Sequence, residues 1–351
     1  MSKRRSQVRL HLWYLAGCLA GCFSTPPVAP QDPQADFFNA LLLHRKLAVY
    51  PGPSDIDNRY RSTVKVLTTA VGSGRLQDLR CSGSLIAPRV VLTAAHCVCP
   101  KRGIRQEDLN GAPRKTSPAP GATSIKAARV KGHNVDAIVE PSTCAKDVAV
   151  TAVVRKPGTK RAETIDNNGS ARAPPETEIL FDQDDIVWSR ADLAVVVLDA
   201  PFEEPLPTYD LTSAEVKVGD QLTLVGLGVD PNPERSGTRR FGQNEVTSMN
   251  PPDEFLAGAQ TLADGGAATH VDIGDSGGGC YKANDNKVLV GVIGSRATAP
   301  NGYVFSVITS VHAHLPWLRR QIEEARGPQP PQLRPDAGVP GEAPDASAPG
   351  P

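Results

Sequence analysis

Two short segments of this chain carry side chains suited to nucleophilic catalysis. A serine stands among glycines in residues 274–279 (GDSGGG), and a histidine stands in residues 92–97 (LTAAHC). Glycines on a tight turn leave the Ser276 hydroxyl exposed and let backbone N–H groups converge on one point. The His96 imidazole can take the proton of such a hydroxyl. Each residue alone reads more simply as a turn serine or a core histidine, but together they point to acyl transfer.

An acidic residue must orient the imidazole, and two aspartates between these segments have similar contexts. Asp147 lies in KDVAV and Asp192 in RADLAVVVL. Asp192 opens an apolar run that ends at residues 199–202 (DAPF), and such a run is typical of a strand buried on both faces. We therefore expect Asp192 to be the acid and Asp147 to lie in a loop or short strand. A long insertion then separates His96 from Asp192.

The segments around His96, Asp192 and Ser276 resemble, in this order, the trypsin/chymotrypsin-like serine proteases. The resemblance covers roughly residues 49–325, including a strand and Gly-x-Gly turn at residues 219–228. The number of residues that usually separates histidine and aspartate in the family is closer to the separation of His96 from Asp147. The sequence after Asp192, however, resembles the family's next strand.

The resemblance implies an all-β fold of two six-stranded antiparallel β-barrels with a C-terminal helix, here over residues 315–325. It implies that Ser276, His96 and Asp192 form a catalytic triad, with the N–H groups of Gly274 and Ser276 as the oxyanion hole. The implied function is a serine endopeptidase that cleaves protein or peptide through an acyl-enzyme, without cofactor or metal. The alternative is a membrane-anchored pseudoprotease that acts as a protein-binding module, although no triad residue is lost.

The residues expected around the substrate pocket depart from the trypsin pattern. His270 stands where trypsin-like members keep an acidic residue, and Asp272 stands where the family has a pocket cysteine. Gly294, Ser295 and Arg296 replace the family's Ser-Trp-Gly wall. Trypsin-like specificity is therefore not expected. In one interpretation His270 and Arg296 favour an acidic side chain at the cleaved residue; in the preferred one, Arg296 points to solvent beside a small apolar pocket.

The cysteines suggest an oxidising compartment, where disulfides persist. The resemblance implies a bridge between Cys81 and Cys97 that pins the histidine loop, and closing about 15 residues contributes about 3 kcal/mol. Cys99 and Cys144 are expected to pair with each other, which leaves Cys280 as a buried free thiol.

The first 22 residues have the features of an export signal, with basic residues followed by a short apolar run. This run contains LAGC twice, ending at Cys18 and at Cys22, and LAGC resembles the lipobox of bacterial lipoproteins. We expect Cys22 to be acylated, which anchors the protein to a membrane of the cell envelope, at the outer membrane or in the periplasm. The alternative is an ordinary cleaved signal and a secreted protein.

The predicted domain order after residues 1–22 is a spacer or propeptide over 23–48, a protease domain over 49–326 and a disordered tail over 327–351. The insertion at about residues 100–180 is expected to form elaborated surface loops attached to the first barrel, with short apolar strands at 125–130, 137–139 and 148–154.

Val49 resembles the family's mature N-terminal residue. In the family, proteolysis before this residue frees its amino group. The resemblance implies that the freed amine of Val49 pairs with the carboxylate of Asp275, because a buried charge is stable only when it is paired.

The formal net charge is zero and the isoelectric point is near neutral. This balance argues against a nucleic-acid partner, which requires a basic patch. We expect a monomer. His312 and His314, close to the expected C-terminal helix, are predicted to be surface histidines.

Overall fold

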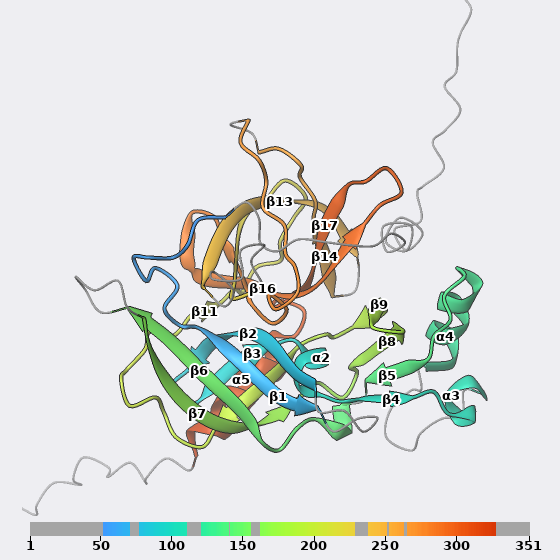
Figure 1. Cartoon of the computed structure of the whole chain (residues 1–351), viewed down its shortest axis with the longest axis horizontal. Helices are drawn as coiled ribbons and strands as arrows, with labels where there is room; N and C mark the ends of the chain where they lie inside the picture. The colour runs from blue at the N-terminus through green and yellow to red at the C-terminus, as the bar shows by residue number, and fades with distance from the viewer. Residues whose placement is uncertain are drawn as a thin grey trace, which may run out of the picture. The chain divides into compact units, whose positions relative to one another are not determined.

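The computed structural model describes residues 52–70, 77–110, 121–139, 141–155, 162–228, 238–250, 253–262 and 265–327. The expectations for the signal segment, Cys22, the spacer, Val49 and the tail beyond Gly327 lie outside the described residues. Within these ranges, no helix is both long enough and apolar enough to cross a membrane. Two β-barrels and a smaller sheet make up most of the described chain (Figure 1).

The first barrel closes in the order β1-β2-β3-β10-β7-β6. Its strands are β1 (Thr63–Ala70), β2 (Gln77–Ala87), β3 (Val90–Thr93), β6 (Val148–Arg155), β7 (Ala162–Arg172) and β10 (Ala194–Leu198). In β6 every second side chain is buried, as expected of a strand with one face toward the core. Strands β3 and β10 are buried almost throughout because helix α5 (Leu315–Arg326) packs against both of them.

The second barrel consists of β12 (Gln221–Gly226), β13 (Arg240–Asn250), β14 (Glu254–Ala257), β15 (Gly279–Lys282), β16 (Asp285–Thr298) and β17 (Val304–Ser310). Its strands pair in the order β16-β15-β12-β13-β14-β17, and β17 pairs again with β16, which closes the ring. The short strand β11 (Asp210–Leu211) adds to β16 in parallel. The prediction of two six-stranded antiparallel barrels with a C-terminal helix is therefore confirmed.

A third, four-stranded sheet in the order β4-β5-β8-β9 contains much of the insertion (Figure 1). Its elements and those beside it are β4 (Lys101–Gly103), α3 (Gln106–Asn110), α4 (Gly121–Val130), β5 (Ala137–Val139), the 3-10 turn η1 (Pro141–Thr143), β8 (Glu178–Asp182) and β9 (Asp185–Arg190). Helix α4 packs on the sheet through Ile125 and Ala128, which join Ile138, Leu180 and Val187 in a small core of their own.

The strands predicted at 137–139 and 148–154 are present as β5 and as part of β6. The prediction for residues 100–180 was wrong in two other respects. The stretch is not made of surface loops alone, because it contributes β6 and the whole of β7 to the first barrel, and β4, β5 and part of β8 to the third sheet. Residues 125–130, expected as a strand, belong to helix α4. The two buried residues of this stretch, Ile125 and Ala128, are three positions apart, which is a helical spacing.

Two disulfides are present in the described chain. Cys81 of β2 is bonded to Cys97 of α2 (Ala95–Val98), and Cys99 is bonded to Cys144. Cys280 in β15 is free and fully buried, and burial raises the pKa of its thiol far above the ordinary value. A buried thiol of this kind is chemically inert.

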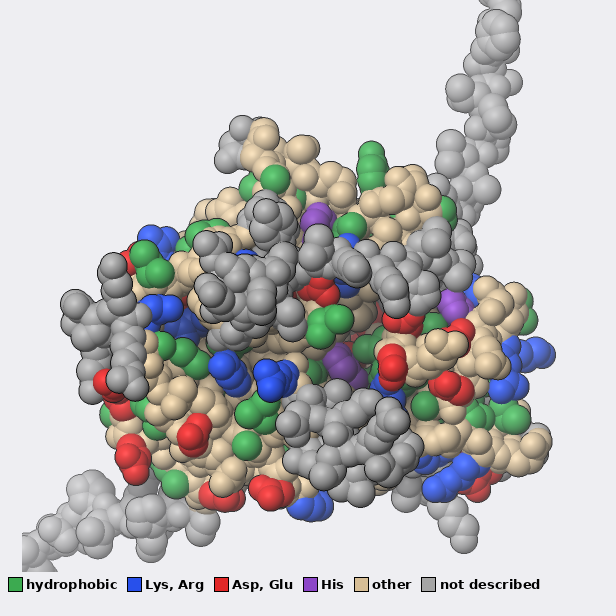
Figure 2. Space-filling model, in the orientation of Figure 1, with side chains coloured by type: hydrophobic (Ala, Val, Ile, Leu, Met, Phe, Trp, Pro, Cys, Tyr) green, Lys and Arg blue, Asp and Glu red, His purple; other side chains and the backbone are tan. Residues whose placement is uncertain are grey.

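Charged side chains of both signs are interspersed on the face of the molecule that Figure 2 shows. This distribution agrees with the zero formal net charge. On this face there is no extended field of one sign that would attract a charged polymer.

Candidate active site

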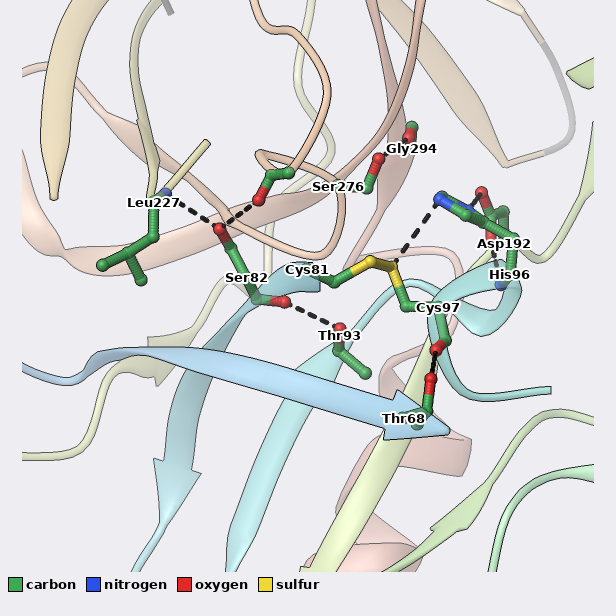
Figure 3. Close-up of a disulfide and its surroundings, with 11 residues drawn as sticks. Thr68, Cys81, Ser82, Thr93, His96, Cys97, Asp192, Leu227, Ser276 and Gly294 are labelled. Carbon is green, nitrogen blue, oxygen red and sulfur yellow. Dashed lines mark hydrogen bonds and ion pairs between the residues drawn. A yellow bond between two sulfur atoms is a disulfide. The ribbon is translucent and has the colours of Figure 1, made fainter. Parts of the chain in front are cut away.

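His96 lies in α2, a helix of one turn that follows β3. The Cys81–Cys97 disulfide ties this turn to β2, and Thr68 Oγ1 donates to the Cys97 carbonyl at 2.7 Å (Figure 3). So short a helix has little stability of its own. These cross-links therefore fix the position of the His96 backbone.

Asp192 lies in the turn between β9 and β10, and its carboxylate is buried against His96. Its Oδ2 is 2.8 Å from His96 Nδ1, and its Oδ1 accepts the backbone N–H of His96 at 3.1 Å. A carboxylate can only accept, so Nδ1 carries a proton and Nε2 of the neutral ring is left as a base. Asp147 is exposed, just before β6. The structure thus brings Asp192, and not Asp147, to His96.

Ser276 lies in the tight turn that precedes β15, and its hydroxyl is turned away from the imidazole. Its Oγ donates to the Gly294 carbonyl at 2.9 Å (Figure 3), while His96 Nε2 lies 3.6 Å from Cys97 Sγ. Among the described residues, His96 and Ser276 share no hydrogen bond. Catalytic hydrogen bonds commonly tighten only when substrate binds.

Cys81, His96 and Cys97 place potential metal-ligand atoms within 4.8 Å of one another. The two sulfurs are bonded to each other in the disulfide. They therefore offer no thiolate, which is the form of cysteine that binds metals.

The turn around Ser276 depends on glycine at two positions. Gly274 and Gly277 have φ angles of 89° and 82°, which side chains disfavour. A Cβ atom on Gly277 would also lie 2.2 Å from the Ser82 carbonyl oxygen. Within the described chain, the backbone N–H groups of Gly274 and Ser276 have no acceptor. These two donors, the N–H of the serine itself and that of the residue two positions before it, can bind an oxyanion.

Asp275 lies between Gly274 and Ser276 in the sequence. Its buried side chain is directed toward the end of β12 and not toward the two N–H donors. Its carboxylate accepts the backbone N–H groups of Gly228 at 2.8 Å and Asp272 at 3.0 Å. A Cβ atom on Gly226 would lie 2.1 Å from Asp275 Oδ1, so the glycines of this strand end make room for the carboxylate. These bonds lock the serine turn onto the end of β12.

The residues expected to form the substrate pocket lie on two facing segments. Arg296 of β16 is ion-paired with Asp272 at 3.4 Å, and only 19% of the Arg296 side chain is exposed. His270 Nδ1 faces Asn244 Nδ2 at 3.4 Å. Burial lowers the pKa of His270 to about 4, and the charge of Arg296 adds to this shift. His270 is therefore neutral near pH 7.

The preferred interpretation, in which Arg296 points to solvent, was wrong. The sequence gives no sign of the ion pair with Asp272, because the two residues lie 24 positions apart. It links the serine loop to β16 near the place where the family's pocket disulfide is missing. Gly294 and Ser295 precede Arg296 on the same strand, and the Gly294 carbonyl holds the Ser276 hydroxyl.

A second group of buried ionisable residues lies next to Ala191, the residue before Asp192. The sequence analysis missed this group. Asp253 and His314 are in contact, with Asp253 Oδ2 3.2 Å from His314 Nε2. His314 is 6% exposed, so the prediction of a surface histidine was wrong for this residue. The adjacent acids Asp253 and Glu254, close to an apolar stretch, were the sequence signal that could have revealed the group.

Replacing Glu254 with Gln is expected to stabilise the fold increasingly between pH 4.5 and 8. Burial raises the pKa of Glu254 from 4.5 to about 8, and the charge of Asp253 adds to this. A carboxyl with a raised folded pKa contributes stability below pH 4.5 that is lost as the pH rises through 8. Thermal unfolding across this window should show the difference between variant and wild type growing with pH. A difference that stays constant would contradict the assignment.

Two closed barrels, with an Asp–His pair and a glycine-flanked serine, are the architecture of the trypsin-like fold. A model of the trypsin family matches residues 59–181. Residues 59–181 are thus similar to part of a trypsin-like serine protease domain. The matched stretch includes His96 and ends before Asp192 and Ser276. No curated protein matches the chain significantly.

Proposed function

We propose that this protein is a serine endopeptidase in which Ser276, His96 and Asp192 act as a triad. The observation that carries the proposal is the buried Asp192–His96 contact beside a serine turn with two free N–H donors. The trypsin-family match supports a protease-type function with protein or peptide as the substrate.

In the proposed reaction, Ser276 Oγ attacks the carbonyl carbon of the peptide bond while His96 Nε2 accepts the hydroxyl proton. The N–H groups of Gly274 and Ser276 bind the resulting oxyanion, and Asp192 stabilises the imidazolium. His96 then gives the proton to the leaving amine as the C–N bond breaks, which leaves an acyl-enzyme. Water attacks the ester by the same route and regenerates Ser276. Each oxyanion donor typically contributes about 3–4 kcal/mol to transition-state binding.

A fluorophosphonate probe tests the proposal directly, because it bonds covalently only to an activated serine. The wild-type protein should be labelled, and labelling requires Ser276 to leave the Gly294 carbonyl and approach His96. Wild-type protein that stays unlabelled although it is folded would favour the alternative of a protein-binding module.

Substrates with Lys or Arg at the cleaved residue are expected to be poor. Arg296 places a positive charge in the pocket region, His270 is neutral, and the Asp272 carboxylate is engaged by Arg296. Like charges should reduce the turnover of Lys and Arg peptides by about tenfold or more relative to uncharged peptides. A peptide-library cleavage profile measures this, and Arg296→Gln should narrow the gap. Efficient turnover of an arginine ester, unchanged in Asp272→Ala, would contradict the pocket assignment.

We also propose that the protein is lipid-anchored through Cys22, on the basis of the repeated LAGC sequence. The wild type should incorporate labelled palmitate and sediment with membranes. Each buried CH₂ contributes about 0.8 kcal/mol, so more than one acyl chain is needed for stable anchoring. Because Cys18 could substitute for Cys22, the informative variant replaces both with alanine. Membrane association of that double variant would refute the proposal, as would a wild type found wholly in the medium.

A further inference from the structure

The residue before Asp192 has a backbone conformation that its side chain disfavours. Ala191 has a φ of 52°, in the left-handed region that few residues other than glycine adopt. Such a conformation persists only where surrounding groups hold it. The Ala191 carbonyl accepts hydrogen bonds from Leu193 N–H at 2.7 Å and Thr177 Oγ1 at 3.0 Å. The bond to Leu193 makes a three-residue turn with Asp192 at its centre.

The N–H group of Ala191 is held by a buried carboxylate of the second barrel. It donates to Asp253 Oδ2 at 2.6 Å, and the same oxygen is 3.2 Å from His314 Nε2. On its other side, His314 Nδ1 lies 3.4 Å from Glu176, whose side chain is 37% exposed. Both ring nitrogens thus lie near carboxylate oxygens, which can only accept hydrogen bonds.

These contacts form a continuous series of side-chain interactions. It runs from Glu176 at the surface through His314 and Asp253 to the backbone beside Asp192. Asp253 and His314 have side-chain exposures of 7% and 6%, so water does not readily replace either partner. Asp253 immediately precedes β14 and His314 immediately precedes α5. The turn that carries Asp192 is therefore fixed by residues remote from it in sequence.

We propose that Asp253 and His314 are positioning residues that hold Ala191 in its left-handed conformation and thereby aim the Asp192 carboxylate at His96. The inference rests on the proposed triad for its effect on catalysis. His314 acts through Asp253, because it orients the oxygen that accepts the Ala191 N–H. Neither residue contacts His96 or Ser276 in the structure.

The test compares Asp253→Ala, Asp253→Asn and His314→Ala at a temperature where all are folded. Asp253→Ala should lower kcat about tenfold to a hundredfold with KM nearly unchanged, because a small misplacement of a catalytic group is costly. Asp253→Asn keeps an oxygen for Ala191 and should lose less. His314→Ala should fall between them.

A second substitution separates positioning from general damage to the fold. Glycine adopts the left-handed conformation without a side-chain penalty. Ala191→Gly should therefore partly restore kcat in the Asp253→Ala background. Glu254→Gln is the matched control, since it alters a buried carboxyl adjacent to Asp253 that makes no bond to Ala191, and it should leave kcat unchanged. Equal losses in Asp253→Ala and Glu254→Gln, or no restoration by Ala191→Gly, would overturn the proposal.

A readout that needs no turnover keeps this proposal distinct from the proposed function. The His96 Nδ1 proton bonded to Asp192 should give a low-field NMR resonance, assigned by its loss in His96→Gln. The resonance should shift or broaden in Asp253→Ala and stay in place in Glu254→Gln. An unchanged resonance in Asp253→Ala would refute the positioning role even if the protein proves inactive, whereas an inactive wild type with the expected resonance changes would refute only the protease function.

Discussion

Ser276→Ala is expected to abolish covalent labelling by a fluorophosphonate and to reduce peptide hydrolysis by roughly a millionfold. The substitution removes only the hydroxyl group, whose single hydrogen bond as donor goes to the Gly294 carbonyl. The fold should therefore remain intact. The measurement is labelling and kcat beside a thermal unfolding curve of the same sample.

His96→Ala should cost nearly as much in hydrolysis, because members of a triad act as a unit. The Cys81–Cys97 disulfide and the Thr68 bond do not involve the imidazole and should keep α2 in place. Persistent labelling of Ser276→Ala would mean that another residue is the nucleophile. A folded His96→Ala protein with wild-type kcat would remove the general base from the mechanism.

Asp192→Asn is expected to lower kcat about ten-thousandfold near neutral pH. An amide NH₂ facing His96 Nδ1 favours the tautomer whose proton is on Nε2, so the ring can no longer accept the serine proton. Asp147→Asn is the matched control, because Asp147 is exposed. It should leave kcat unchanged. The reverse outcome, with a large loss in Asp147→Asn alone, would assign the acid to the wrong aspartate.

The parts of the fold that local sequence specifies could be predicted. The apolar run after Asp192 forms β10, and β10 is buried on both sides because the helix expected over residues 315–325 packs against it. The glycine pattern around Ser276 similarly indicated a tight turn, and Gly274 and Gly277 indeed have positive φ angles. In each case one short segment contained the whole signal.

Features that depend on partners from distant segments could not be predicted. Arg296 was predicted to be exposed because no residue near it in the sequence indicates its partner Asp272. His314 was predicted to be exposed because its partners Asp253 and Glu176 lie far from it in the sequence. Burying a charged group requires a partner, and the partner is supplied only by the tertiary fold. Residues 125–130 were mistaken for a strand because short apolar runs are ambiguous between strand and helix.

Strand β9 of the third sheet continues directly into Ala191 and Asp192, and this has a consequence for attempts to shorten the protein. Trp188 of β9 packs both against the small core of that sheet and against Leu256 and Val307 of the second barrel. Trimming the third sheet to obtain a minimal two-barrel protein would therefore remove the support of Asp192, the proposed catalytic acid, along with it. Loop engineering should instead target connections that end at neither β9 nor the Ala191 turn, such as that between α3 and α4.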